Sequence, residues 1–211
     1  MGQKLVSFSL YGTDKRYHDG AIANAGLMKT IYPGWNMRVY CADDVDANKL
    51  ERMGVQIERM GVSHEHSGML WRFLPAWDPD IDRVIFRDLD SRINPKEAAA
   101  VAAWMVSGKM AHSMHDHPHH GCLPVMGGMW GIIGNSLPNL MSAWTRFMSG
   151  NKRRVMDMQI LRTYVWPHIK DSVLTHSSVK LEWPYEPFPP HAQWNGFIGQ
   201  QIDDNGNQVW P

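Results

Sequence analysis

Two aspartates, Asp88 and Asp90, come shortly after the apolar residues 83–86 (RVIF), which form the strongest strand candidate in the chain. Residues two apart on an extended strand point to the same side, with Cα atoms about 6 to 7 Å apart. Carboxylate oxygens are the ligands that Mg²⁺ and Mn²⁺ prefer in proteins. Two of them leave coordination positions for a substrate diphosphate, so the pattern favours a divalent metal site over plain salt bridges to Arg87 and Arg92.

Polar residues also follow two earlier apolar segments. Residues 4–10 (KLVSFSL) end in the turn 11–14 (YGTD), and residues 36–41 (NMRVYC) precede Asp43 and Asp44. Ligands of open α/β sheets bind outside the carboxyl ends of the strands. We therefore expect these polar residues and the paired aspartates to meet at one edge of a sheet.

The first half of the chain alternates strand-like and helix-like segments. Apolar runs predict strands over residues 4–10, 36–41, 55–60 and 83–86. Helical spacing and capping residues predict helices over residues 18–32, 45–53, 67–77 and 95–106. This alternation predicts an α/β fold with a mostly parallel central sheet flanked by helices.

The second half lacks this regularity. Residues 112–120 are rich in histidine, residues 125–134 are glycine-rich and apolar, and the chain after position 183 is punctuated by proline and glycine. Helical spacing returns only over residues 136–149 and 156–164. No linker or repeat divides the sequence, so we expect a single domain, 1–211, with an irregular C-terminal third.

Composition excludes several classes of protein. Among 211 residues, 21 basic side chains balance 21 acidic ones, which removes the positive field of a dedicated nucleic-acid-binding protein. Only residues 152–154 (KRR) form a local basic patch. No apolar run reaches the roughly 18 residues of a membrane helix, so we expect no membrane span. Cys41 and Cys122 are too few for a disulfide scaffold, and we expect a cytoplasmic protein.

The order of the motifs resembles that of GT-A-fold glycosyltransferases with an Asp-x-Asp motif, near the bacterial and viral members of glycosyltransferase families 8 and 32. The resemblance rests on SLYG, CADD, GMLWRF and RDLDSR in the first half, and on HSMHDHPHHGCLPVMGGMWG, MDMQILRTYVWP and LTHSS in the second. It covers roughly positions 4 to 200. It implies a Rossmann-related fold in which residues 1–110 bind a nucleotide-diphosphate-sugar donor, expected to be a UDP-sugar. Residues 111–211 would then carry the acceptor and catalytic half.

The resemblance also implies roles for particular residues. Donor-binding roles fall on Leu10, Tyr11, Gly12, Asp43, Asp44, Arg72, Asp88, Gly127, Gly128 and Trp130. Mn²⁺ or Mg²⁺ would be held by Asp88, Asp90 and His176. Asp157 is a candidate for catalysis or for hydrogen bonds to sugar hydroxyls. The chain departs from the family at Met158, where glutamine is usual, and at His115, where arginine is expected.

The histidines between positions 112 and 120 also suggest a zinc site, although their spacing matches no known ligand set. We expect instead a loop in the substrate cleft, in which Asp116 is the second catalytic candidate. Trp130 lies beside glycines and is expected to stack on a sugar, whereas Trp71, Trp77, Trp104, Trp144 and Trp166 occur at helical positions and are expected in the core.

Three other functions remain open at this point. A nucleotidyltransferase uses a related sheet and an acidic metal site, but residues 11–16 contain only one glycine where a glycine-rich loop is expected. A non-catalytic sugar-binding or partner-binding module would bind no nucleotide with metal. A zinc protein would retain zinc. For the transferase, the acceptor hydroxyl could belong to a glycan, a lipid-linked sugar, a protein or a modified base, and a partner subunit could supply part of its site.

Overall fold

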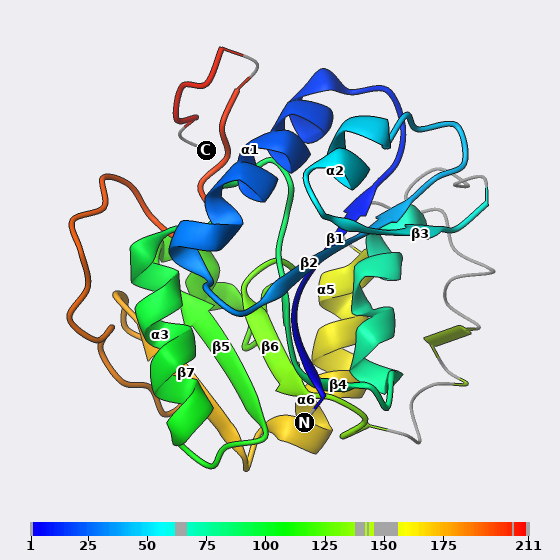
Figure 1. The fold of residues 1–211 in the computed structure, drawn as a ribbon. Coiled ribbons are helices and arrows are strands. Elements are labelled where there is room, and N and C mark those ends of the chain that lie inside the picture. Colours follow the sequence, from blue (N-terminus) through cyan, green and yellow to red (C-terminus); the bar gives the residue numbers. More distant parts are fainter. Residues whose placement is uncertain are drawn as a thin grey trace.

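The fold was obtained as a computed structural model that describes residues 2–61, 67–137, 142, 144–145, 156–203 and 205–209. Within these residues one seven-stranded sheet, in the order β3-β2-β1-β4-β6-β5-β7, forms the centre of the molecule (Figure 1). Its strands are β1 (Gln3–Leu10), β2 (Asn36–Cys41), β3 (Gln56–Arg59), β4 (Ile81–Phe86), β5 (Ala111–His115), β6 (Trp130–Ile133) and β7 (Val173–Ser177). Strands from both halves of the chain therefore share one sheet.

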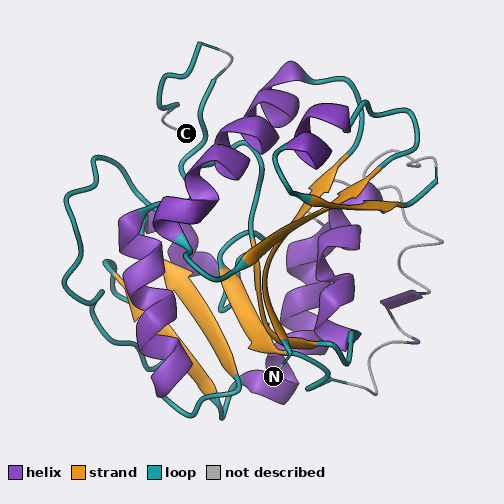
Figure 2. Cartoon of the chain, in the orientation of Figure 1, coloured by secondary structure: helices purple, strands orange, loops and turns teal. Residues whose placement is uncertain are grey.

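Helices lie on both sides of this sheet (Figure 2). They are α1 (Lys15–Ile31), α2 (Asn48–Arg52), the 3₁₀ helix η1 (Ser67–Trp77), α3 (Pro95–Val106), the 3₁₀ turn η2 (Pro118–Cys122), α5 (Met156–Ile160), the π-helical turn η4 (Leu161–Val165) and α6 (Trp166–Ile169). None of the helices within the described residues is both long and apolar enough to cross a membrane.

The sheet is mostly parallel, as predicted. β1 pairs in parallel with β2 and β4, β2 with β3, and β5 with β7. Only β6 runs antiparallel to its neighbours, β4 and β5. Because β1 and β4 are parallel neighbours, the residues that follow them emerge at the same edge of the sheet.

The two faces of the sheet bury separate cores. Alternate residues of β1 show the division: Val6 and Phe8 face the core that contains α1 and α3, whereas Leu5 faces the core that contains η1 and α5. Phe73 of η1 fills the second core against Phe86 of β4, with ring centroids 5.1 Å apart. The strands are therefore buried on both faces, as parallel strands usually are.

Local signals in the first half of the sequence predicted these elements closely. β2 and α3 match their predicted bounds, and the Asn94 side chain caps α3 by accepting the Glu97 N–H at 3.0 Å. α1 begins at Lys15, earlier than predicted, because Asp14 caps it by accepting the Arg16 N–H. α2 begins later than predicted, at Asn48.

The histidine-rich segment differs from the prediction. Residues 112–115 are not a cleft loop but part of β5, where His112 and His115 are fully buried. Tertiary pairing with β6 and β7 overrides the polar composition, because it satisfies the backbone of this segment inside the sheet. The helix predicted over residues 136–149 and the basic patch at 152–154 lie largely or wholly outside the described residues.

Candidate active site

The carboxyl ends of β1 and β4 open into a cavity of about 770 Å³. Tyr11 and Gly12 after β1 and Asp88 and Asp90 after β4 line it together. The volume lies in the range of roughly 300 to 1,000 Å³ that is usual for small-molecule sites. Burial raises the pKa of Tyr11 to about 12, so its hydroxyl remains a hydrogen-bond donor at neutral pH.

Arg72 of η1 connects two of the aspartates in this cavity. Its guanidinium donates to Asp88, and its Nη2 donates to Asp157 Oδ2 at 2.8 Å. The Arg72 side chain is only 7% exposed. Burial alone would lower the pKa of Arg72, but the two carboxylates outweigh it and the pKa is raised. Arg72 is therefore a fixed positive charge that holds Asp88 and Asp157 in place.

The main chain of Arg72 is fixed by β1. Ser7 Oγ donates to the Arg72 carbonyl at 2.6 Å, and the Arg72 N–H donates to Ser9 Oγ at 2.9 Å. These two serines satisfy backbone groups of a 3₁₀ helix, whose own hydrogen-bond geometry is poor. The first strand thus positions the arginine as well as forming the edge of the cavity.

Asp90 is a buried carboxylate, 5% exposed. Burial first, and the negative charge of Asp88 second, raise the pKa of Asp90 to about 6, whereas Arg16 and Arg72 act in the opposite direction. The turn that carries Asp90 packs closely against α1 at Gly20. A Cβ at this position would lie 1.8 Å from the Leu89 carbonyl oxygen, so the close packing depends on glycine.

Gly127 and Gly128 make room for the charged groups. A Cβ on Gly127 would lie 2.3 Å from Asp157 Oδ2, and a Cβ on Gly128 would lie 1.9 Å from Asp88 Oδ2. At both distances the carboxylate would have to move to make room for a Cβ, so glycine is what lets the backbone approach the carboxylates in their present positions. The two glycines line the cavity as expected, and their contacts show a reason for glycine that the sequence alone does not reveal.

Asp157 lies in the first turn of α5 and faces the same cavity. Its Oδ1 accepts the Met158 N–H at 2.8 Å. Burial raises the pKa of Asp157, and Arg72 opposes that shift. Met158, which stands where glutamine was expected, also lines the cavity, so that part of the wall is apolar.

The charges around the cavity fit a divalent cation. Among its described lining residues are four aspartates, Asp14, Asp88, Asp90 and Asp157, but only two arginines, Arg16 and Arg72. The aspartates outnumber the arginines, and one of them, Asp90, is buried from water. A buried carboxylate in a negatively charged cavity favours a bound cation. In the described part of the chain, no group of three or more His, Cys, Asp or Glu side chains could hold a metal. Asp88 and Asp90 would thus supply two ligands and leave the others to substrate and water.

Four residues expected to bind the donor do not line this cavity: Leu10, Asp43, Asp44 and Trp130. The Leu10 side chain is 1% exposed and belongs to the core around α1. Asp43 and Asp44 are exposed at the end of β2, where the Asp43 carboxylate accepts the Gly61 N–H at 3.2 Å. The family resemblance of the SLYG segment implied a donor-binding role for Leu10, but its side chain points to the same buried face of β1 as Val6 and Phe8.

Trp130 is not a stacking platform for a sugar. It lies on β6, is 1% exposed and contacts the rings of Phe86 and Phe73, with centroids 4.5 and 5.8 Å away. The neighbouring glycines suggested an open surface. The position is instead in the core on the η1 face of the sheet, where a large aromatic ring is well accommodated.

Asp116 is a buried structural carboxylate and does not line the cavity. It accepts hydrogen bonds from Lys96 Nζ at 2.5 Å, from Ser178 Oγ and from the Ile198 N–H at 2.9 Å. Its side chain is 2% exposed. Asp116 therefore connects α3, the segment after β7 and the C-terminal segment, and the catalytic role expected for it is not supported by its position.

His176 is also distant from the paired aspartates in the sheet order. It lies on the edge strand β7, and its Nδ1 is 3.0 Å from His112 Nε2. Its ring stacks on Phe188. The strands β6 and β5 separate β7 from β4, so His176 is not placed to share a metal with Asp88 and Asp90.

Sequence reasoning missed several residues that line the cavity. Arg16 and Tyr17 belong to the first turn of α1, directly after the strand-end turn, and extending the strand-end argument by one helical turn would have found them. Gly199 and Gln201 carry no local signal. They reach the cavity because the Ile202 N–H donates to the Asp90 carbonyl at 2.7 Å, a contact between distant parts of the chain.

With its mixed sheet and flanking helices, the chain has the fold of GT-A-type, Rossmann-like proteins. One similar structure is "a glycosyltransferase involved in the glycosylation of the major capsid of PBCV-1", with a TM-score of 0.54 and 15% identity over 85% of each chain. Another is 4-diphosphocytidyl-2C-methyl-D-erythritol synthase from Anaerococcus prevotii, with a TM-score of 0.54 and 10% identity over 83% of this chain and 87% of that one. A mannosyltransferase from Pyrobaculum calidifontis, in complex with GDP-Man and Mn²⁺, gives a TM-score of 0.48 and 12% identity over 66% of this chain and 47% of that one.

Neither the family models nor the curated protein sequences give a match to this chain. At identities of 10 to 15%, the structural likeness establishes a shared fold. Proteins with differently named activities share that fold to the same degree, so the activity has to be argued from the site.

Proposed function

We propose that this protein is a metal-dependent glycosyltransferase that moves a sugar, expected to be a hexose, from a nucleotide-diphosphate-sugar to a hydroxyl acceptor. The observation that carries the proposal is the group formed by Asp88, Asp90, Arg72 and Asp157 in a cavity at the carboxyl ends of β1 and β4. Paired carboxylates suit the cation that accompanies a diphosphate, and the remaining space suits a nucleoside and a sugar.

Asp88 and Asp90 would hold Mn²⁺ or Mg²⁺, which, when bound, neutralises negative charge on the departing diphosphate. Arg72 keeps Asp88 turned into the cavity and places a buried positive charge beside the same phosphates. The Tyr11 hydroxyl is available as a donor to the nucleotide, with Gly12 leaving room beside it.

During transfer, the acceptor oxygen forms a bond to the anomeric carbon of the sugar. The bond between that carbon and the diphosphate oxygen breaks, and its electron pair leaves on the diphosphate. Asp157 is the carboxylate that we assign to the acceptor hydroxyl proton, because it lines the cavity and its raised pKa makes it a better base than an exposed aspartate.

The structure offers less support for a nucleotidyltransferase. Such an enzyme would place a triphosphate near the start of α1, where helix N–H groups attract anions. Here the Asp14 carboxylate already accepts the Arg16 N–H at 3.0 Å and occupies that position with a negative charge. Incubation with CTP or UTP and a sugar phosphate should therefore release no pyrophosphate.

Two further parts of the proposal concern the whole chain. Residues 1–211 are proposed to act as one domain, because strands from the donor half and the acceptor half belong to one sheet. The second part is a cytoplasmic location. Cys41 and Cys122 are both unpaired, as is usual for cysteines in the reducing cytoplasm.

Thermal unfolding with UDP and with GDP, each with and without Mn²⁺, tests the donor site. A nucleotide that fills the site at 100 times its dissociation constant stabilises the folded state by about 2.7 kcal/mol. We expect this stabilisation in the wild type only with Mn²⁺, and we expect Asp90→Asn to abolish it because one of two metal ligands is lost.

The matched control is Asp171→Asn, which changes an exposed aspartate outside the cavity and should behave as the wild type. If neither nucleotide stabilises the wild type in the presence of Mn²⁺, the donor site is wrongly assigned. Where one nucleotide succeeds, metal-dependent hydrolysis of the corresponding nucleotide-sugars identifies the donor sugar.

A further inference from the structure

A second, smaller cavity adjoins the donor cavity. It has a volume of about 220 Å³ and is lined by His117, His119, Phe197 and Val209, together with three residues that it shares with the donor cavity. The shared residues are His120, Gly199 and Gln201. A ligand in the second cavity would thus lie directly next to the place of the donor.

The walls of this second cavity are uncharged apart from its imidazoles. No aspartate, glutamate, lysine or arginine is among the described residues that line it. Imidazole nitrogens and the Gln201 amide can pair with hydroxyl groups, and Phe197 presents an aromatic ring. A phosphate or carboxylate would find no fixed positive partner there, so the wall favours a neutral, hydroxyl-rich ligand.

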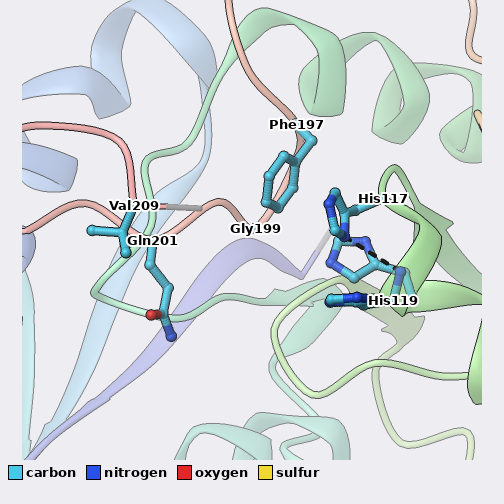
Figure 3. A pocket seen from close by; sticks show the side chains of 7 residues that line it. His117, His119, Phe197, Gly199, Gln201 and Val209 are labelled. Atoms are coloured by element: carbon cyan, nitrogen blue, oxygen red, sulfur yellow. Dashed lines mark hydrogen bonds between the residues drawn. The ribbon is translucent and has the colours of Figure 1, made fainter. Parts of the chain in front are cut away.

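The aromatic part of the wall is held in a defined orientation. Figure 3 shows the Phe197 ring lying against His117, and their centroids are 4.4 Å apart with an angle of 30° between the planes. His117 is oriented in turn by the His119 N–H, which is 3.3 Å from its Nδ1. These contacts fix one side of the cavity before any ligand binds.

His120 lies at the junction of the two cavities and has a defined tautomer. Its Nδ1 accepts the Asp116 N–H at 3.2 Å, so the proton of the neutral ring is on Nε2. Burial lowers the pKa of His120 to about 4, which keeps the ring neutral at pH 7. His120 Nε2–H is consequently a hydrogen-bond donor and not a base.

The C-terminal strap, defined here as residues 197–202, lines both cavities through Gly199 and Gln201. It is tied to the rest of the fold at two points: the Ile198 N–H donates to Asp116 Oδ2 at 2.9 Å, and the Ile202 N–H donates to the Asp90 carbonyl at 2.7 Å. Gly199 and Gln201 lie between these points. The strap therefore fixes the position of the second cavity relative to Asp88 and Asp90.

We infer that the second cavity is the acceptor subsite and that it holds one neutral sugar ring, with His120 Nε2–H donating to a ring hydroxyl and Phe197 contacting the ring carbons. The inference rests on the proposed function, because the adjoining cavity has to hold the donor. The volume lies below the roughly 300 to 1,000 Å³ of drug-sized ligand sites, which fits one ring better than an oligosaccharide.

Saturation-transfer NMR with methyl glycosides of glucose, galactose and mannose, added to the full chain with UDP or GDP and Mn²⁺, tests this inference. We expect at least one glycoside to bind, and 3-phosphoglycerate, used as an anionic hydroxyl probe, not to bind. His120→Asn keeps an acceptor for the Asp116 N–H but loses the Nε2 donor, so it should bind the glycoside about tenfold more weakly.

His120→Gln places an amide nitrogen near the position of Nε2 and should bind more tightly than His120→Asn. Phe197→Ala should weaken binding as well, whereas Val106→Thr, at a position that is 86% exposed on α3, should leave it unchanged. Thermal unfolding of each variant with nucleotide and Mn²⁺ shows that the fold and the donor site persist. A His120→Gln variant that binds no better than His120→Asn would contradict the role of the donor nitrogen.

The outcomes separate this inference from the proposed function. If nucleotide and Mn²⁺ stabilise the protein but no glycoside binds, or 3-phosphoglycerate binds more tightly, the acceptor subsite is wrongly assigned and the transferase proposal stands. If glycosides bind but neither nucleotide does, the transferase proposal fails, and the acceptor role fails with it.

Discussion

Arg72 determines the geometry of the candidate site at the scale of single residues. One planar guanidinium reaches Asp88 and Asp157, which come from different elements and lie far apart in the sequence. A lysine ammonium is a single point charge and could not hold both carboxylates in the same fixed arrangement. Gly127 and Gly128 complete this arrangement, because the absence of their side chains leaves the space that the two carboxylates occupy.

Gly128→Ala tests this arrangement directly. The new Cβ would lie 1.9 Å from Asp88 Oδ2, so Asp88 has to leave its position beside Arg72. We expect a loss of about 1 to 3 kcal/mol in the free energy of unfolding. We also expect the Mn²⁺-dependent stabilisation by nucleotide to disappear. Denaturant titration and thermal unfolding with nucleotide measure the two effects.

Gly26→Ala is the matched control for this substitution. Gly26 lies on the exposed side of α1, with nothing within 4 Å of the added Cβ. Alanine in a helix interior is more stable than glycine by about 0.5 to 1 kcal/mol, so this variant should gain stability and retain nucleotide binding. Retention of full nucleotide binding by Gly128→Ala would show that Asp88 does not hold the metal in its present position.

At the scale of elements, the C-terminal strap is anchored by a carboxylate that the sequence suggested for catalysis. Asp116 follows β5 and accepts hydrogen bonds from α3, from the segment after β7 and from the strap itself. A buried carboxylate with a lysine partner and two further donors is satisfied as a structural group. The strap then forms part of both cavities without belonging to any helix or strand of the sheet.

Asp116→Ala should therefore destabilise the protein more than Ser178→Ala, which removes only one of the donors to this carboxylate. Removing the carboxylate leaves the Lys96 ammonium, 16% exposed, without its counter-charge, and breaking a buried ion pair costs about 3 to 5 kcal/mol. Ser178→Ala removes one neutral donor and should cost about 1 kcal/mol. Denaturant titration of both variants compares the two values, and equal losses would exclude an anchoring role for Asp116.

At the scale of the whole molecule, buried histidines make stability depend on pH. His112 is fully buried on β5, stacked on Trp104 and 3.0 Å from a nitrogen of His176. Burial first, and then the electrostatic influence of His176, Arg87 and His115, lower the pKa of His112 well below 6.5. None of these neighbours is an acid that could stabilise a protonated His112.

The direction of the pH effect follows from this shift. The folded state resists protonation of His112, whereas the unfolded chain takes up a proton as the pH falls below 6.5. The contribution of neutral His112 to the free energy of unfolding is therefore fully present above pH 6.5. It decreases as the pH falls below 6.5, by up to about 1.4 kcal/mol per pH unit. Denaturant titration between pH 7 and pH 5 measures the slope.

His112→Gln keeps a donor toward His176 but cannot titrate, so its stability should fall less steeply with pH. His191→Gln replaces an exposed histidine and should leave the slope of the wild type unchanged. A slope in His112→Gln as steep as that of the wild type would mean that other groups cause the acid sensitivity.

The sequence by itself determined those features that depend on residues close together along the chain. The alternation of strands and helices up to residue 106 was readable because hydrophobic period, capping residues and turn residues act within one element. The same local pattern predicted that Asp88 and Asp90 lie at the carboxyl end of a central strand.

Only the tertiary structure decided which polar residues face the cavity. Trp130, His112 and His176 looked suited to ligands but are buried in or beside the sheet, and Asp116 anchors the C-terminal strap. Gln201 carried no signal, yet it lines both cavities. The physical reason is that burial and hydrogen-bond partners are set by contacts between residues far apart in the chain, which the local periods of a sequence do not encode.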